Sequence, residues 1–168
     1  MDRRMQMTKT IFGVTSAVFD NDGYMPVAYT GYGLDDSPPL TLSGLVPQAK
    51  TLAIIMEDLD IPLIRAFTHW IIWNIPAGTE IPGAIPAGES LPSLGGAQQG
   101  VAYGKHEYRG PKPPKFIRNV HRYRFTVYAL DRLLDISSDA NKRDLLRAMQ
   151  GHILQQASIT GLYKNGAR

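Results

Sequence analysis

The alternation of apolar and polar residues predicts most of the secondary structure of this chain. Three short, mostly apolar segments are bounded by turn-forming or acidic residues, as core β-strands are: residues 50–58, 68–75 and 121–130. Two further strands are expected at residues 11–19 and 24–29, on either side of the turn sequence Asn21-Asp22-Gly23. Glycine and proline recur so often between residues 76 and 120 that this stretch is expected to be mostly loop.

Beyond Ser138 the apolar spacing changes to that of an amphipathic helix. A helix is therefore predicted near residues 139–157, with Ser138 or Asp139 as its N-cap and Gly161 as its stop. Its apolar face would contain Leu145, Leu146, Met149, Ile153 and Leu154. Together these elements predict a mainly β fold, an antiparallel β-sandwich with a C-terminal α-helix. It would form a single domain over residues 11–168, behind a flexible N-terminus of residues 1–10.

The composition of the 168-residue chain is typical of a globular protein, with 43% hydrophobic and 20% charged residues and no apolar run long enough to span a bilayer. The absence of cysteine excludes disulfides, thiolate metal sites and cysteine nucleophiles. The first ten residues lack the apolar stretch of a secretory signal, so a cytoplasmic location is expected. The net charge is only +3, which solvated Lys and Arg side chains explain better than a nucleic-acid surface.

Three core strands each carry one ionisable residue at an end, on the apolar face. Because side chains alternate between the two faces of a strand, His121 shares a face with Tyr123 and with the apolar residues that follow. Asp58 ends the apolar face of its own segment. His69 stands near the start of its segment and is expected on the same face as Ile71.

The short connection between residues 59 and 68 predicts an antiparallel return that places Asp58 near His69. Spacing leaves open whether residues 76–120 bring His121 to the same edge. If they do, one carboxylate and two imidazoles would form a concave, partly cationic site suited to phosphate or a carboxylate. The opposing interpretation, a set of hydrogen-bonded core histidines, stays open at this stage.

Two other kinds of chemistry use the same residue types. Two histidines and a carboxylate can hold a metal ion, but no H-x-x-x-H pair with helical spacing is present. A hydrolase using the Asp58, His69 and His121 cluster would need a nucleophile or an acid–base pair. Ser90 and Ser93 lie in a glycine- and proline-rich loop without a G-x-S-x-G elbow. Anion binding is therefore favoured, and no metal or cofactor is expected.

Some residues outside this cluster also carry expectations. His106 is expected in an exposed loop. Basic residues of the proline-rich segment either surround the pocket mouth and attract anions or are solvated loop charge: Lys112, Lys115 and Arg118. Apolar residues expected on an exposed strand face would supply contact area for self-association: Trp70, Ile72 and Tyr128.

An ordered set of short motifs runs along the chain: Ser37-Pro38-Pro39-Leu40, Asp58-Leu59-Asp60-Ile61-Pro62, His69-Trp70, Tyr108-Arg109-Gly110-Pro111-Lys112-Pro113-Pro114 and His121-Arg122-Tyr123. This combination resembles the phosphatidylethanolamine-binding protein family and, within it, the prokaryotic Raf kinase inhibitor-like branch. The resemblance extends from about residue 11 to Tyr163. No single motif is decisive, but their order is highly specific.

The resemblance implies a β-sandwich with a C-terminal helix and a small pocket at one end that binds phosphate or a phospholipid headgroup without catalysis. It implies the ligand-binding set Asp58, Pro62, His69, Tyr108, Gly110, Pro113, Pro114, His121 and Tyr123. Some relatives inhibit kinases or proteases by binding them, and prokaryotic relatives often form homodimers. A homodimer and a kinase or protease partner are therefore implied as well.

The chain departs from the family pattern at three places. Leu59 stands between the two aspartates where relatives usually have proline, and Leu42 stands where many relatives have tryptophan. The loop of residues 95–100 lacks the asparagine often found there. These differences concern the shape of the pocket and its ligand rather than the fold.

Overall fold

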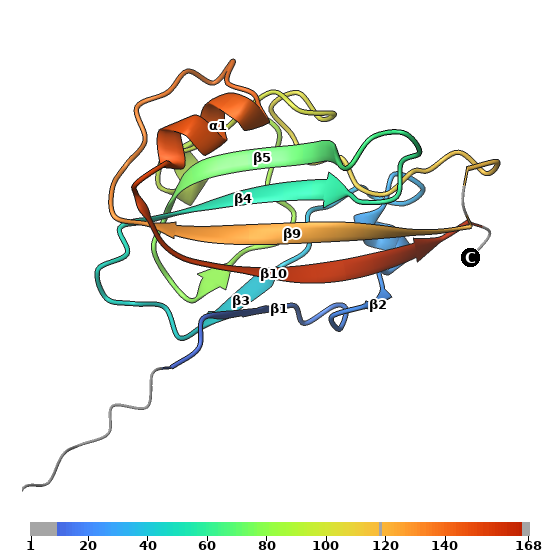
Figure 1. The fold of residues 1–168 in the computed structure, drawn as a ribbon, viewed down its shortest axis with the longest axis horizontal. Coiled ribbons are helices and arrows are strands. Elements are labelled where there is room, and N and C mark those ends of the chain that lie inside the picture. The colour runs from blue at the N-terminus through green and yellow to red at the C-terminus, as the bar shows by residue number, and fades with distance from the viewer. Residues whose placement is uncertain (1–9, 118, 166–168) are drawn as a thin grey trace, which may run out of the picture.

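The computed structural model describes residues 10–117 and 119–165 and shows a mainly β protein with two sheets (Figure 1). The larger sheet has the strand order β2-β10-β9-β4-β5-β8-β7. Its strands are β2 (Gly23–Tyr24), β4 (Thr51–Asp58), β5 (Phe67–Pro76), β7 (Ser90–Leu91), β8 (Ala97–Gln99), β9 (Val120–Leu130) and β10 (Ile153–Lys164). The smaller sheet, of order β1-β3-β6, contains β1 (Gly13–Thr15), β3 (Leu40–Ser43) and β6 (Glu80–Ile81). The other elements are the helix α1 (Lys142–Met149) and the short 3-10 helices η1 (Val27–Tyr29) and η2 (Pro92–Leu94).

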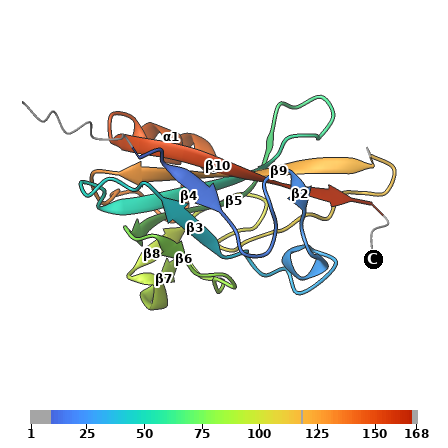
Figure 2. The same ribbon diagram turned by 90° about the horizontal axis from the view of Figure 1, so that it is seen from below.

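The main core lies between the two sheets, which Figure 2 shows from below. Leu52 and Ile54 of β4 share this core with Leu40 and Leu42 of β3. The opposite face of the large sheet packs against α1.

This second core joins Ala53 and Ile55 of β4 to Leu145 and Met149 of α1. Because both faces of β4 are covered, all eight of its residues are buried. A strand covered on both faces carries a nearly continuous apolar run, as residues 51–58 do.

The three predicted core strands are confirmed as β4, β5 and β9. β4 lies between the other two and pairs antiparallel with both. Its last residue, Asp58, is opposite Phe67 on one side and Tyr123 on the other. The pairing therefore brings the polar ends of the three strands to one edge of the sheet.

A helix is present near the C-terminus, but it is shorter than predicted and ends earlier in the chain. α1 spans only Lys142–Met149, and Asn141 caps it through a capping box with Asp144. Gly151 then turns the chain with φ +81°, and Ile153 begins β10 instead of a further helical turn. In the described part of the chain, no helix has the length and apolarity needed to cross a membrane.

Pairing with β9 decides this outcome. β10 runs antiparallel to β9 along nearly its whole length, and these backbone hydrogen bonds override a weak local helical spacing. The predicted helix stop Gly161 lies inside β10 opposite Tyr123. A Cβ atom at Gly161 would stand 2.5 Å from Met25 Cγ, so the glycine is required for packing.

The two N-terminal strands are shorter than predicted and belong to different sheets. β1 pairs with β3 in the small sheet, whereas β2 pairs in parallel with β10 in the large sheet. The Asn21-Asp22-Gly23 turn joins the sheets: its Asp22 N–H donates to the carbonyl of Thr160 at 2.7 Å, and the Asn21 side chain accepts from Thr160 N–H at 2.9 Å. The segment that follows, expected to be a strand, contains the 3-10 helix Val27–Tyr29.

Two of the three residues expected on an exposed apolar face are buried. Trp70 and Ile72 are 2% and 0% exposed in the main core, and only Tyr128 is partly accessible. Trp70 and Ile72 therefore supply no contact surface for self-association, and the homodimer prediction rests mainly on the family resemblance.

Candidate functional site

A β-bulge places His69 at the pocket. Met56 pairs with Trp70 and Glu57 with Thr68, so His69 is an extra residue on β5 with no partner of its own on β4. The bulge changes the phase of the strand. The His69 ring therefore contacts the Tyr123 ring, with centroids 5.3 Å apart, while Ile71 packs in the second core. The prediction that His69 and Ile71 share a face is wrong, because strict alternation has no place for a bulge.

Asp58 and His121 form a buried pair at the end of β4 and β9. The distance between Asp58 Oδ2 and His121 Nδ1 is 2.8 Å, and the two residues are 1% and 0% exposed. Asp58 Oδ1 accepts a second hydrogen bond, from the Asp60 N–H at 2.8 Å. An ionised carboxylate can only accept, so His121 carries its proton on Nδ1. Its buried Nε2 has no hydrogen-bond partner among the described residues.

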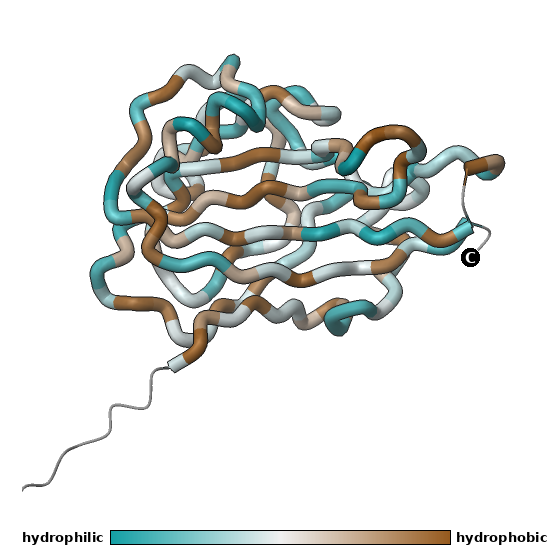
Figure 3. The backbone as a smooth tube through the Cα atoms, viewed as in Figure 1, coloured by the Kyte–Doolittle hydropathy of each residue, from teal (hydrophilic) through white to brown (hydrophobic). Residues whose placement is uncertain are grey.

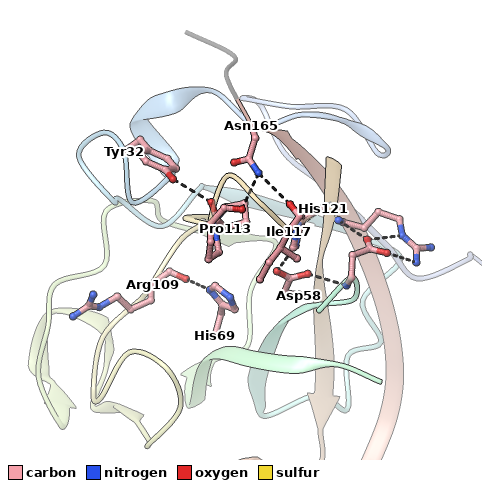
Figure 4. A network of polar contacts seen from close by, with 11 residues as sticks. Tyr32, Asp58, His69, Arg109, Pro113, Ile117, His121 and Asn165 are labelled. Carbon is pink, nitrogen blue, oxygen red and sulfur yellow. Dashed lines mark hydrogen bonds and ion pairs between the residues drawn. The ribbon is translucent and has the colours of Figure 1, made fainter. Parts of the chain in front are cut away.

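His69 is held by a different contact. Its Nδ1 donates to the carbonyl oxygen of Arg109 at 2.8 Å (Figure 4), which leaves Nε2 as the nitrogen that can meet a ligand. Burial lowers the pKa of His69, while the hydrogen bond to Arg109 and the charges of Asp58 and Asp35 act in the opposite direction. The ring is therefore neutral at pH 7 and gains its charge at a lower pH than an exposed histidine does.

The Tyr123 hydroxyl is buried and makes no well-formed hydrogen bond within residues 10–117 and 119–165, but the Asp58 carboxylate is close enough to interact with it. Burial and the nearby negative charge of Asp58 raise the pKa of Tyr123 far above the usual value. The phenol therefore keeps its proton at any physiological pH and is a permanent hydrogen-bond donor. Its ring lies between those of His69 and His121, with centroids 5.3 and 6.3 Å away.

A pocket of about 250 Å³ opens at this edge of the sheet. Its walls combine the polar groups above with proline and apolar side chains: Asp58, Ile61, Phe67, His69, Tyr103, Lys112, Pro113, Pro114, Ile117 and Tyr123. The β4–β5 loop, which supplies Ile61, is largely apolar (Figure 3).

The structure brings five of the nine predicted site residues to the pocket wall: Asp58, His69, Pro113, Pro114 and Tyr123. His121 is held against Asp58 and is fully buried, without being part of the wall. The other three residues lie elsewhere. Pro62 is exposed in the β4–β5 loop. The Tyr108 hydroxyl donates to the Tyr29 carbonyl at 2.8 Å, and its ring packs on Trp70 in the core.

Gly110 is required for a close approach of two chain segments rather than for the pocket wall. Its N–H donates to Asp35 Oδ1 at 2.7 Å. A Cβ atom at Gly110 would stand 2.4 Å from the Tyr29 carbonyl oxygen and 2.7 Å from Asp35 Oδ1. Any other residue would push these groups apart.

Sequence reasoning missed several pocket residues. Phe67 and Tyr103 pack edge-on against the His69 ring, with centroids 5.5 and 5.1 Å away. Tyr103 lies in a loop without periodicity, so no pattern pointed to it, whereas Phe67 directly precedes the predicted strand. Of the basic residues considered, Lys112 lines the pocket and Lys115 is exposed, while Arg118 lies outside the described residues.

Two departures from the family pattern have visible structural consequences. The Leu59 N–H donates to the Arg122 carbonyl at 2.9 Å, a bond that the usual proline could not make. Within residues 95–100, Gln99 at the end of β8 accepts from Trp70 Nε1 at 2.7 Å, and its side-chain NH2 group lies 3.0 Å from the carbonyls of Pro86, Gly88 and His106. The third departure, Leu42, is a core residue of β3 that is 3% exposed.

His106, expected to be exposed, is buried. The His106 Nδ1 lies 2.8 Å from the Gln99 carbonyl oxygen, and only 9% of the residue is exposed. The backbone at His106 adopts φ +55°, which lets the loop fold back over Gln99. The prediction of an exposed His106 is wrong because a loop of polar residues carries no sequence signal that it packs on the protein.

Two features define the structural class of this protein: a mainly β fold with two sheets, and a carboxylate–histidine pocket at one end of the large sheet. The sequence model of the phosphatidylethanolamine-binding protein family matches residues 15–164, and the chain belongs to this family.

Relatives of this chain agree with that membership. A UPF0098 protein of Pyrococcus horikoshii is 43% identical over 150 residues, which cover 89% of this chain and 75% of the relative. The crystal structure of a phosphatidylethanolamine-binding protein homologue from Chlamydia trachomatis superimposes with a TM-score of 0.80 at 32% identity, covering 92% of this chain and 98% of the other. Escherichia coli YbcL, described as a member of the mammalian family, gives a TM-score of 0.81 at 28% identity, with coverage of 91% and 98%.

Proposed function

We propose that this protein binds a small anion or a phosphorylated ligand, of the phosphate or phospholipid-headgroup type, in the pocket between Asp58, His69 and Tyr123. The observation that carries the proposal is that the Tyr123 hydroxyl, a buried donor of the pocket wall, makes no well-formed hydrogen bond in the described residues and lies beside the Asp58 carboxylate. A buried polar group that lacks a partner is costly to the fold, so such groups point to a ligand or a bound water.

Three groups would contact the anion in complementary ways. Tyr123 donates a hydrogen bond at every physiological pH. His69 donates through Nε2 and adds a positive charge once it is protonated. Lys112 lines the pocket and supplies a positively charged side chain.

Asp58 limits the charge of the ligand. Its carboxylate would repel a dianion, but its oxygens each have a lone pair left after the bonds to His121 and Asp60. A phosphate monoanion could donate its own O–H to one of these oxygens. The site therefore suits a singly charged phosphate or phosphomonoester better than a doubly charged one.

The size and walls of the pocket favour an attached organic group. About 250 Å³ is slightly less than the volume of drug-sized ligand sites, which begin near 300 Å³. The apolar walls, formed by Phe67, Tyr103, Pro113 and Ile117, would be poorly used by inorganic phosphate alone. A phosphorylated headgroup fits this combination.

The hydrolase alternative has less support. Among the described residues, the pocket wall contains no Ser, Thr or Cys that could form a covalent intermediate. Regulation of a kinase or protease by binding, homodimer formation and a cytoplasmic location are hypotheses that come from the family resemblance and from the sequence.

Calorimetric titration with inorganic phosphate and with phosphoethanolamine at pH 6 tests the proposal. Saturable binding is expected, with the phosphomonoester binding more tightly, and His69→Gln should weaken it about tenfold or more through the loss of a charge-assisted hydrogen bond. His152→Gln is the matched control, because His152 pairs with Asp131 away from the pocket. Absence of saturable heat with both ligands would refute the proposal, and steady release of nitrophenol from p-nitrophenyl phosphate would favour the hydrolase.

A further inference from the structure

One peptide group connects the carboxylate of Asp35 to the ring of His69. The Gly110 N–H donates to Asp35 Oδ1 at 2.7 Å, and the Arg109 carbonyl accepts from His69 Nδ1 at 2.8 Å. That N–H and that carbonyl belong to the same peptide unit. It is a trans peptide, since no cis bond occurs in the described part of the chain, so its donor and acceptor point in opposite directions.

Hydrogen bonds in such a chain strengthen one another. The negative carboxylate attracts the Gly110 proton, which increases the electron density on the Arg109 oxygen and makes it a better acceptor. A better acceptor stabilises the proton on His69 Nδ1, and stabilises it more when the ring is positively charged. Asp35 is thus linked to His69 through one peptide group, whereas Asp58 contacts His121 directly.

The local structure is built around this contact. Asp35 adopts φ +59°, a left-handed conformation in which Asp and Asn are tolerated better than most residues. Gly110 has no Cβ, and only this allows the carboxylate to come within hydrogen-bond distance. Asp35 is half-buried, and burial raises its pKa, while the Gly110 N–H and the charge of Arg109 lower it. A half-buried carboxylate in a left-handed backbone conformation points to a specific role for Asp35.

Other titratable groups also face the His69 ring. They are Asp58 from the end of β4, His121 and Tyr123 from β9, Tyr103 and Lys112 from the loops, and Asp35. Asp58 already accepts from His121 and from the Asp60 N–H, and the charge of His121, when present, opposes protonation of His69. The Arg109 guanidinium lies over the Tyr103 ring and next to Glu107. Of these groups, Asp35 is the carboxylate joined to the His69 ring by a continuous hydrogen-bonded chain.

We infer that Asp35 is a positioning residue: through the Arg109–Gly110 peptide it fixes the Nδ1–H tautomer of His69 and stabilises the protonated ring. Its consequence for ligands rests on the proposed anion binding, since Asp35 would then set the pH at which the pocket gains its second positive group. Its effect on His69 itself needs no ligand.

The Asp35→Asn variant tests the inference. Asparagine tolerates the left-handed backbone and can still accept the Gly110 N–H, so the charge is removed while the contact is kept. The pKa of His69, followed by NMR of the imidazole resonances, should fall by about 0.5–1 unit, as expected for one carboxylate at short range. Asp36→Asn removes the same charge from the next residue and should leave the His69 titration within error of wild type. An unchanged His69 in Asp35→Asn, or equal shifts in both variants, would overturn the inference.

A measurement on the unmodified protein covers the case in which Asp35→Asn fails to fold. The Gly110 amide resonance should titrate together with His69, because protonation of the ring pulls on the same peptide group, whereas the distant Gly78 amide should not. A Gly110 amide that ignores the His69 titration would contradict the inference.

Phosphate titrations separate this inference from the proposed function. If Asp35→Asn lowers the His69 pKa but wild type binds neither phosphate nor phosphoethanolamine, the coupling stands and the proposed function fails. If wild type binds phosphate and Asp35→Asn shows the same His69 pKa as wild type, the proposed function stands and the role of Asp35 is refuted.

Discussion

The carboxylate of Asp58 and the imidazole of His121 are joined by a 2.8 Å hydrogen bond, with both side chains almost completely removed from solvent. These residues are 63 positions apart, and they meet because β4 and β9 pair along their whole common length. The contact fixes the orientation of the Asp58 carboxylate, which lines the pocket.

Removing the Asp58 carboxylate should destabilise the fold. In Asp58→Ala, His121 would lose the only described hydrogen-bond partner of its buried ring, and the Asp60 N–H would lose its acceptor. The free energy of unfolding should decrease by about 2–4 kcal/mol, measured by urea denaturation at pH 7. Asp135→Ala, on the surface, should show no measurable change. Equal stability of Asp58→Ala and wild type would contradict the buried pair.

The stability of the protein should depend on pH through His69. Burial lowers the pKa of His69, so below about pH 6.5 the unfolded chain binds a proton that the folded protein still excludes. The contribution of His69 to the free energy of unfolding therefore has its full value above about pH 7. It decreases as the pH falls through about 6.5.

Urea denaturation in phosphate-free buffer at several pH values between 5 and 8 checks this. His69→Gln should lose less stability than wild type over that range. A variant whose stability follows the same pH curve as wild type would show that His69 does not titrate as described.

Tyr123→Phe should separate binding from stability. The hydroxyl makes no well-formed hydrogen bond in the described residues, although it lies near the Asp58 carboxylate, so its removal should change the free energy of unfolding by less than about 1 kcal/mol. Affinity for phosphate should fall about tenfold through the loss of one hydrogen bond to a charged group. Tyr128→Phe, on the opposite face of β9, should leave affinity unchanged. Comparison of denaturation and calorimetry on both variants decides, and an unaltered affinity in Tyr123→Phe would exclude the hydroxyl as a ligand contact.

Gly110→Ala should be destabilising although the change adds only a methyl group. The new Cβ would stand 2.4 Å from the Tyr29 carbonyl oxygen, so the Asp35 contact and the loop must move. The expected loss is about 1–3 kcal/mol in thermal or urea unfolding. Gly78 is the matched control, because nothing lies within 4 Å of a Cβ at that position. Similar losses in Gly110→Ala and Gly78→Ala would argue against a close approach at Gly110.

Leu59→Pro, which restores the usual family residue, should weaken this protein. Proline lacks the N–H that donates to the Arg122 carbonyl, and the orphaned acceptor should reduce the free energy of unfolding by about 1 kcal/mol. Leu59→Ala keeps the N–H and serves as the reference for the lost side chain. If the proline variant is at least as stable as the alanine variant, the hydrogen bond contributes nothing net.

The local alternation of apolar and polar residues was sufficient to predict the central strands. β4 and β9 are apolar on the face that meets the small sheet, and alternation predicted that face correctly from Leu52 to Asp58 and from His121 to Ala129. The burial of side chains depends there on strand period alone, so the sequence carries the information locally.

Contacts between distant segments determined the remaining features. Residues 153–164 have a spacing compatible with a helix, yet they form β10 because β9 offers a long row of backbone partners. The bulge at His69 appears only when β4 is paired with β5, and it reverses the side on which the histidine lies.

The chain by itself determined the mainly β character, the three central strands and the polar residues at their ends. Only the tertiary structure decided that Asp58, His69 and Tyr123 line one pocket with His121 behind them, that Gly110 serves a close approach, and that Asp35 reaches His69 through a peptide group. The physical reason is the range of the interactions. Strand period acts between neighbouring residues, whereas a bulge, a buried pair and a shared peptide group depend on segments that meet only after folding.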